Sequence, residues 1–134
     1  SYPSQGALWD ELDGYLQRHR ARVSPPGVTV YYQEEPIDLE VCVPLDESAG
    51  GADLPDEGRV RVHQLEGIEQ AAAAIHSGPL QAIGEAYKSL VGWIERNGYQ
   101  LAGPMREVYL NGPQAHSQTD PGVVVEIQAP IAKA

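Results

Sequence analysis

The feature that most constrains this chain is an internal repeat. Residues 8–32 (LWDELDGYLQRHRARVSPPGVTVYY) align with residues 86–110 (AYKSLVGWIERNGYQLAGPMREVYL) at an offset of 78 positions. The matched pairs run in order: Trp9 with Tyr87, Leu12 with Leu90, Gly14 with Gly92, Tyr15 with Trp93, Arg18 with Arg96, Pro26 with Pro104, Val30 with Val108 and Tyr31 with Tyr109. After a loop of different length, residues 40–44 (EVCVP) match residues 126–130 (EIQAP). An ordered match of this kind predicts one structural unit that occurs twice.

Each copy predicts the same local structure. An amphipathic helix comes first, with apolar or aromatic side chains at helical spacing. These side chains are Leu8, Leu12, Tyr15, Leu16 and His19 in the first copy and Ile83, Tyr87, Leu90, Val91 and Ile94 in the second. Gly78-Pro79 precedes the second helix and Asn97-Gly98 ends it. A turn marked by proline follows, then a strand (28–32, 105–110), a polar loop and a second strand (39–45, 123–129).

Two further strands are predicted between the copies. Valine alternates with arginine and histidine over residues 59–64, and the alanine-rich run 69–76 is short and follows a turn, which favours a strand. The second copy is therefore expected to be β-β-α-β-β, whereas the first shows only α-β-β and lacks its leading strands, which indicates a fragment of a longer protein. We predict one α+β domain, residues 1–134, made of repeat one (1–45), an acidic, glycine-rich linker (46–58) and repeat two (59–134).

One face of the predicted antiparallel sheet is a candidate ligand cleft. Helices with a single apolar stripe cover one face of a sheet, and we expect them on the face that carries the valine-rich rows, including Val30 and Val108. The opposite face then carries Thr29, Tyr31, Met105, Glu107 and Tyr109. The sequence thus predicts two pseudo-symmetric repeats with helices on one face and a ligand cleft on the other.

Glu107 is the residue at which the two copies differ in charge. Its counterpart in the first copy is Thr29, and a duplicated architecture does not need that difference, whereas a single ligand charge does. Aromatic faces attract organic cations and a carboxylate supplies the counter-charge, so Tyr31 and Tyr109 beside Glu107 predict a site for such a ligand. Alternatively, Glu107 is solvated or salt-bridged and the tyrosines are cross-strand packing residues. Trp93 either contacts the ligand or packs at the edge of its helix stripe.

The composition argues against several classes of protein. Nine basic and nineteen acidic residues give a net charge of −10, which opposes a nucleic-acid surface. Cys42 is the single cysteine, which excludes an intramolecular disulfide and fits a reducing cytoplasm. No apolar run approaches the ~20 residues of a membrane span. The histidines lack the spacing of a metal site, and we expect neither a metal nor a cofactor.

Four stretches together resemble a GyrI-like effector-binding domain: GPMREVYL, the preceding HSGPLQAIGEAYKSLVGWIERNG, VYYQEEPIDLEVCVPL and VVVEIQAPI. In this family the domain is the ligand-sensing C-terminal part of many MerR-type and AraC-type bacterial regulators, and it also occurs alone. The resemblance implies tandem β-α-β-β repeats around a hydrophobic cleft. In multidrug sensors a glutamate on the penultimate strand meets cationic aromatic drugs, and tyrosines stack on them. Glu107 matches that glutamate and Tyr109 lies beside it, whereas Val123 stands where some drug sensors have tyrosine.

The resemblance also implies the function. We expect the ligand-sensing domain of a bacterial transcription regulator that binds a hydrophobic, cationic aromatic molecule, with a DNA-binding domain upstream of Ser1 and dimers of the full-length protein. The chain itself is not expected to contact DNA or a membrane. The alternatives within the family are a stand-alone hydrolase of reactive cyclopropanoid natural products, with Glu107 activating a water, and a module that inhibits a partner protein. Because G-x-S-x-G, H-E-x-x-H and P-loop motifs do not occur, we assign no catalytic residue outside the hydrolase alternative.

Overall fold

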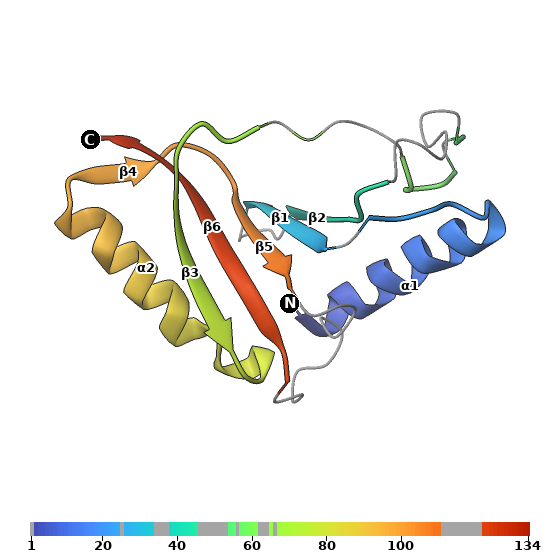
Figure 1. The fold of residues 1–134 in the computed structure, drawn as a ribbon, viewed down its shortest axis with the longest axis horizontal. Helices are drawn as coiled ribbons and strands as arrows, with labels where there is room; N and C mark the ends of the chain where they lie inside the picture. Colours follow the sequence, from blue (N-terminus) through green and yellow to red (C-terminus); the bar gives the residue numbers. More distant parts are fainter. Residues whose placement is uncertain are drawn as a thin grey trace.

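The chain folds into one antiparallel sheet with two long helices (Figure 1). The computed structural model describes residues 2–24, 26–33, 38–45, 54–55, 57–61, 65, 67–110 and 122–134. The elements are α1 (Tyr2–Arg18), β1 (Gly27–Gln33), β2 (Asp38–Cys42), β3 (Ala71–Ser77), the 3-10 helix η3 (Leu80–Ala82), α2 (Gly84–Arg96), β4 (Tyr99–Leu101), β5 (Met105–Tyr109) and β6 (Val124–Lys133). The strand order is β2-β1-β5-β6-β3, and β4 pairs with β6. The α+β class and the antiparallel sheet are therefore confirmed.

Both helices form where the sequence predicts them. In α2 the buried Leu90 and Ile94 come from the predicted stripe. The helix ends at Asn97, and Gly98 follows with a φ of 77°, a backbone conformation that glycine adopts without steric cost. None of the helices in the described part of the chain is long and apolar enough to cross a membrane.

Most predicted strands are confirmed, and one is wrong in its described part. The segments predicted at 28–32, 39–45, 69–76, 105–110 and 123–129 correspond to β1, β2, β3, β5 and β6. The strand predicted at 59–64 does not form over residues 59–61, where Val60 makes only an isolated bridge to Glu57 across a tight turn. Residues 62–64, like most of the predicted linker 46–58, lie outside the described residues. The short strand β4 was not predicted.

The repeat becomes a local two-fold relation between the central strands β1 and β5. Their register pairs Gly27 with Tyr109, Thr29 with Glu107 and Tyr31 with Met105. Thr29 and Glu107 are repeat counterparts, so exchanging the two copies leaves this pair of positions in place. The pseudo-two-fold axis therefore passes between Thr29 and Glu107, and the position at which the copies differ in charge lies at the centre of the repeated architecture.

The predicted assignment of the sheet faces is wrong. Trp9 of α1 packs edge-on against Tyr109, with ring centroids 5.8 Å apart, and Tyr87 of α2 donates a hydrogen bond to Glu107. Both helices therefore cover the face that carries Thr29, Glu107 and Tyr109. The valine-rich row lies on the other face, where Val108 is only partly buried.

The reason for this error lies in β6. Alternate residues of β6 are buried, and Val125, Ile127 and Ala129 have no exposed surface. Because Ile127 pairs with Glu107 and Val125 with Tyr109, these apolar side chains share the face of the glutamate. The core is thus supplied mainly by β6 and α2, and the polar residues of β1 and β5 are buried next to it.

Candidate functional site

The candidate site is centred on the buried carboxylate of Glu107. It lies on β5, a central strand of the sheet, and its side chain is 0% exposed. Its neighbour on β1, Thr29, is also 0% exposed. Burial of a charged group is costly unless hydrogen bonds satisfy it, so the partners of this carboxylate decide what the site can do.

Two tyrosine hydroxyls donate to the two carboxylate oxygens. Tyr87, from α2, donates to Oε2 of Glu107, and the Tyr109 hydroxyl lies 2.9 Å from Oε1. One donor comes from a helix and the other from the same strand, two residues further along. The carboxylate is thus held by neutral phenols on two sides, an arrangement that satisfies hydrogen bonding without adding positive charge.

The hydrogen bonds continue from Glu107 into repeat one. The Tyr109 hydroxyl also lies 2.9 Å from Oγ1 of Thr29, which is 3.2 Å from Oε1 of Gln5. Nε2 of Gln5 then donates to the Tyr31 hydroxyl at 2.6 Å. Gln5 belongs to α1 and is 1% exposed. The network therefore links α1, β1, β5 and α2 through buried side chains.

The Tyr109 hydroxyl lies within hydrogen-bonding distance of both Glu107 and Thr29. A hydroxyl has one proton, so Tyr109 donates either to Glu107 or to Thr29 at any moment. A carboxylate is a stronger acceptor than a hydroxyl, so the hydrogen bond from Tyr109 to Glu107 is favoured. Thr29 donates in turn to Oε1 of Gln5, so the hydrogen bonds run from Glu107 to a side chain of α1.

Tyr109 stays a neutral donor. Burial, and then the negative charge of Glu107, raises the pKa of Tyr109 far above its usual range. The phenol therefore keeps its proton at neutral pH and acts as a hydrogen-bond donor. Since Trp9 packs edge-on against the same ring at 5.8 Å, the tyrosine is also fixed in orientation.

The structure brings together most of the predicted site residues. Glu107, Tyr109, Thr29 and Tyr31 belong to the same hydrogen-bonded network, and Met105 is the cross-strand partner of Tyr31 and packs against the core. Their roles in ligand binding remain predictions. Val123 is buried in the hydrophobic core.

Trp93 lies in a different environment. Its side chain is 43% exposed and stacks on Tyr99, with ring centroids 6.0 Å apart and ring planes 7° apart. It borders a small hollow between α2 and β3 together with Leu90. This position corresponds to the edge of the helix stripe, the alternative that the sequence left open, and ligand contact by Trp93 remains a prediction.

Sequence reasoning missed three residues of the site: Gln5, Trp9 and Tyr87. A signal for two of them was present, because the repeat pairs Trp9 with Tyr87, and Tyr87 belongs to the apolar stripe of its helix. With the helices expected on the opposite face, neither could be assigned to Glu107. Gln5 carried no such signal, since its repeat counterpart is Ile83 and a glutamine on a helix is usually exposed.

A large hollow borders the Gln5 end of the network. It lies between α1 and β2 and has a volume of ≈ 680 Å³. Its walls include apolar side chains, and its rim carries both acidic and basic groups: Gln5, Leu8, Glu11, Leu12, Tyr32, Asp38, Leu39, Glu40, Val41, Arg59, Val60 and Arg61. The volume is within the range of small-molecule sites. No group of three or more potential metal ligands occurs among the described residues.

Comparison with known proteins relates the fold to one regulator. No family model matches the sequence, and no curated protein matches it significantly. The chain is similar to EcmrR, a MerR-family regulator, as seen in the cryo-EM structure of the EcmrR–DNA complex in EcmrR-RPo. The TM-score is 0.73 and the sequence identity 25%, over 100% of this chain and 50% of EcmrR, so the chain spans half the length of that protein.

The crystal structure of the EcmrR C-terminal domain is also similar, with a TM-score of 0.63 and 28% identity over 85% of this chain and 72% of the domain. The chain thus resembles the C-terminal domain of a MerR-family regulator.

Proposed function

We propose that this chain is the ligand-sensing domain of a transcription regulator and that it binds a hydrophobic, cationic aromatic molecule at Glu107. The observation that carries the proposal is a fully buried carboxylate between two aromatic-bearing helices, at the pseudo-two-fold axis of a duplicated fold. The similarity to EcmrR and to its C-terminal domain supports the regulatory role. In a longer protein, a ligand-dependent change in the conformation of this domain would alter the arrangement of a DNA-binding domain.

The chemistry of the site favours a cation. Two neutral phenols donate hydrogen bonds to the carboxylate of Glu107. A ligand cation beside the carboxylate gains both a charge-assisted contact and the attraction of aromatic faces, here Trp9, Tyr87 and Tyr109. In a buried site of low dielectric constant these interactions are stronger than they are in water.

Binding at Glu107 requires movement, since the carboxylate has no exposed surface. Tyr87 is the donor on α2, and Gln5 closes the α1 end of the network. Displacing Gln5 would shift α1, which belongs to repeat one, and displacing Tyr87 would shift α2, which belongs to repeat two. Ligand binding would therefore favour one relative arrangement of the two repeats, which is the differential interaction that a sensor needs.

The test is a titration of aromatic cations against the fluorescence of Trp9 and Trp93. We expect saturable binding to the native chain and a loss of affinity of about tenfold or more in Glu107→Gln, which keeps the size of the side chain but removes its charge. Glu126→Gln is the matched control, because Glu126 lies on the other face of the sheet. The affinity of this variant for the cation should be the same as that of the native chain. Equal binding of cations by the native chain and by Glu107→Gln would refute charge pairing at this residue.

A second variant separates charge pairing from simple packing. Tyr87→Phe removes one donor from Glu107 and keeps the aromatic ring. The carboxylate is then less well satisfied before the ligand binds, so cations should bind about three- to tenfold more tightly. Neutral aromatic molecules of the same shape should not gain affinity. A gain for both classes would indicate that steric access, and not charge, limits binding.

A further inference from the structure

The two helices carry the same group of residues at repeat-equivalent positions. On α1 the group is Gly14, Tyr15 and Arg18, and on α2 it is Gly92, Trp93 and Arg96. In each case the arginine folds back over the glycine one turn earlier. Nη1 of Arg18 is 3.1 Å from the point where a Cβ on Gly14 would lie, and Nη1 of Arg96 is 2.9 Å from the equivalent point on Gly92. The fold thus builds the same arginine–aromatic surface twice.

On α1 this surface holds Pro55 and Glu57, and Glu57 begins the tight turn that its bridge to Val60 closes. The Tyr15 hydroxyl donates to the carbonyl of Pro55 at 2.5 Å, and Arg18 forms an ion pair with Glu57. Tyr15 is only 1% exposed. The contacts consist of an aromatic hydroxyl on a backbone carbonyl and a guanidinium on a carboxylate two residues later. They define the chemistry that this surface recognises.

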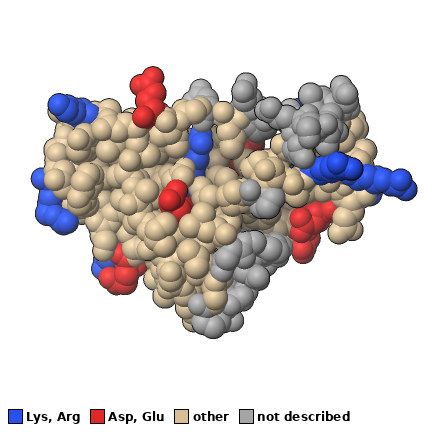
Figure 2. All heavy atoms as spheres, viewed as in Figure 1, with Lys and Arg blue, Asp and Glu red and all other residues tan. Residues whose placement is uncertain are grey.

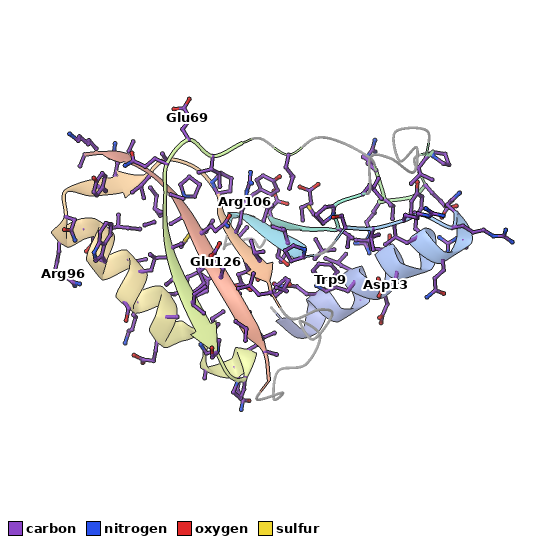
Figure 3. All side chains as sticks on the ribbon, viewed as in Figure 1. Trp9, Asp13, Glu69, Arg96, Arg106 and Glu126 are labelled. Carbon is purple, nitrogen blue, oxygen red and sulfur yellow. The ribbon has the colours of Figure 1, made fainter. Side chains whose placement is uncertain are left out.

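On α2 the same surface is open. Trp93 is 43% exposed, and beside it lies a hollow of ≈ 300 Å³ whose other walls are Ala72, Ala73, Ala74, Ser89 and Leu90. Arg96 is exposed and points away from the body of the molecule at the end of α2 (Figure 3). Within the described part of the chain, Arg96 forms no ion pair.

Charges of both signs lie near Trp93, since the exposed Glu95 and Arg96 follow it on α2. Lys133 pairs in register with Tyr99, on which Trp93 stacks, so a second basic residue lies near this aromatic pair. In the space-filling view, basic side chains flank an uncharged stretch at the edge where α2 and β4 lie (Figure 2). Arg96 and Lys133 are the groups of this surface that would attract an acidic partner.

We propose that the surface formed by Trp93, Arg96 and the alanine-lined hollow binds an acidic, proline-containing segment of another polypeptide. The indole N–H of Trp93 donates to a backbone carbonyl, as the Tyr15 hydroxyl does on α1, and Arg96 pairs with a carboxylate, as Arg18 does. The hollow accommodates an apolar side chain such as proline. A second copy of the chain is a poorer occupant, because its own equivalent segment is already held on its α1 and its net charge is repulsive.

The test uses a capped peptide with the sequence of residues 52–58, ADLPDEG, and the ¹⁵N-labelled 134-residue chain. We expect the indole N–H resonance of Trp93 to shift saturably at submillimolar to millimolar peptide, while that of buried Trp9 does not. Arg96→Ala should weaken binding about two- to fivefold, the range of an exposed ion pair. Lys88→Ala, an exposed charge change on the same helix, is the matched control and should have no effect.

Three results would overturn the proposal. One is the absence of any Trp93 shift at millimolar peptide in a chain that circular dichroism shows to be folded. Another is equal binding of a peptide in which all three acids are replaced by amides, ANLPNQG, because recognition of a carboxylate would then be excluded. The third is concentration-dependent dimerisation of the chain alone that disappears in Trp93→Ala, since a second copy would then be the occupant. None of these outcomes depends on ligand binding at Glu107.

Discussion

The two repeats build the same backbone around the central strands but fill it with different chemistry. At the axis, repeat one contributes Thr29 and repeat two contributes Glu107, and on the helices above them buried Gln5 corresponds to buried Ile83. Because Thr29 and Glu107 are adjacent cross-strand partners, a symmetric sequence would place two carboxylates in contact. A carboxylate at the axis therefore requires a different residue in the other repeat. This structural reason adds to the functional one, that a ligand with a single charge needs only one carboxylate.

The largest effect is expected when the two repeats are made identical at the axis by adding a second acid. Thr29→Glu places two buried carboxyl groups side by side, and one of them must become protonated or the fold must open. We expect a loss of about 3–5 kcal/mol in the free energy of unfolding, measured by urea denaturation at pH 8. Thr29→Val keeps the shape without the hydroxyl and should cost only about 1 kcal/mol.

The pH dependence of Thr29→Glu provides an internal check. The folded state would bind a proton that the unfolded state releases, so a raised carboxyl pKa in the folded state makes stability fall as pH rises. The variant should therefore recover part of its lost stability, relative to the native chain, between about pH 8 and pH 5. A deficit that is the same at both pH values would mean that steric overlap, and not charge, causes the damage.

Symmetry can also be restored in the opposite direction. Glu107→Thr gives both repeats a threonine and leaves the Tyr87 and Tyr109 hydroxyls without their carboxylate acceptor. Unsatisfied buried donors cost about 1–3 kcal/mol, so we expect a loss of unfolding free energy in this range together with loss of cation binding. The measurement combines urea denaturation with the fluorescence titration. Unchanged stability would show that the two phenols find other acceptors.

Much of this architecture was predictable from the sequence, because the repeat constrains it strongly. The offset that aligns Thr29 with Glu107 also determines which positions pair at the axis once β1 and β5 are neighbours. Helix positions followed from apolar spacing, and the alanine run at β3 followed from its length and the preceding turn. These are local or periodic properties, and tertiary contacts did not change them.

The sheet faces were assigned wrongly for a reason that concerns burial of polar groups. Thr29 and Glu107 are polar, so the face that carries them was expected to be open to a ligand. They are buried because Gln5, Tyr87 and Tyr109 provide hydrogen-bond partners from elements distant in the sequence. Whether a buried polar group finds hydrogen-bond partners depends on side chains that meet only in the folded structure. The periodicity of a single strand does not indicate it.

A smaller effect on stability is expected at alkaline pH from two tyrosines that lie on opposite faces of the sheet. Burial raises the pKa of Tyr109 far above the ordinary value near 10, whereas Tyr32, which is half exposed, has its pKa raised to about 12 by burial and by a hydrogen bond to Glu40. A tyrosine with a raised folded-state pKa stabilises the protein below its unfolded pKa, and that contribution is lost as pH rises.

We therefore expect the unfolding free energy to decline from about pH 10 upward. Tyr109→Phe should reduce the slope of this decline, measured by urea denaturation at a series of alkaline pH values. Tyr32→Phe is the comparison variant and should change the slope less, because its hydroxyl is closer to solvent. An equal change in slope for both variants would mean that burial does not distinguish the two phenols.

The smallest expected effect concerns the surface that the two helices share. On α1, Arg18 pairs with Glu57 in an exposed position, whereas on α2 Arg96 has no such partner within the described residues. Solvent screens exposed ion pairs, so Arg18→Ala should lower the unfolding free energy only slightly, and 0.5 M salt should remove the difference. Arg96→Ala should leave stability unchanged at either salt concentration. If instead the two substitutions cost the same, the segment on α1 adds nothing to the stability of that surface, and its value as a template for recognition on α2 would rest on the Tyr15–Pro55 contact alone.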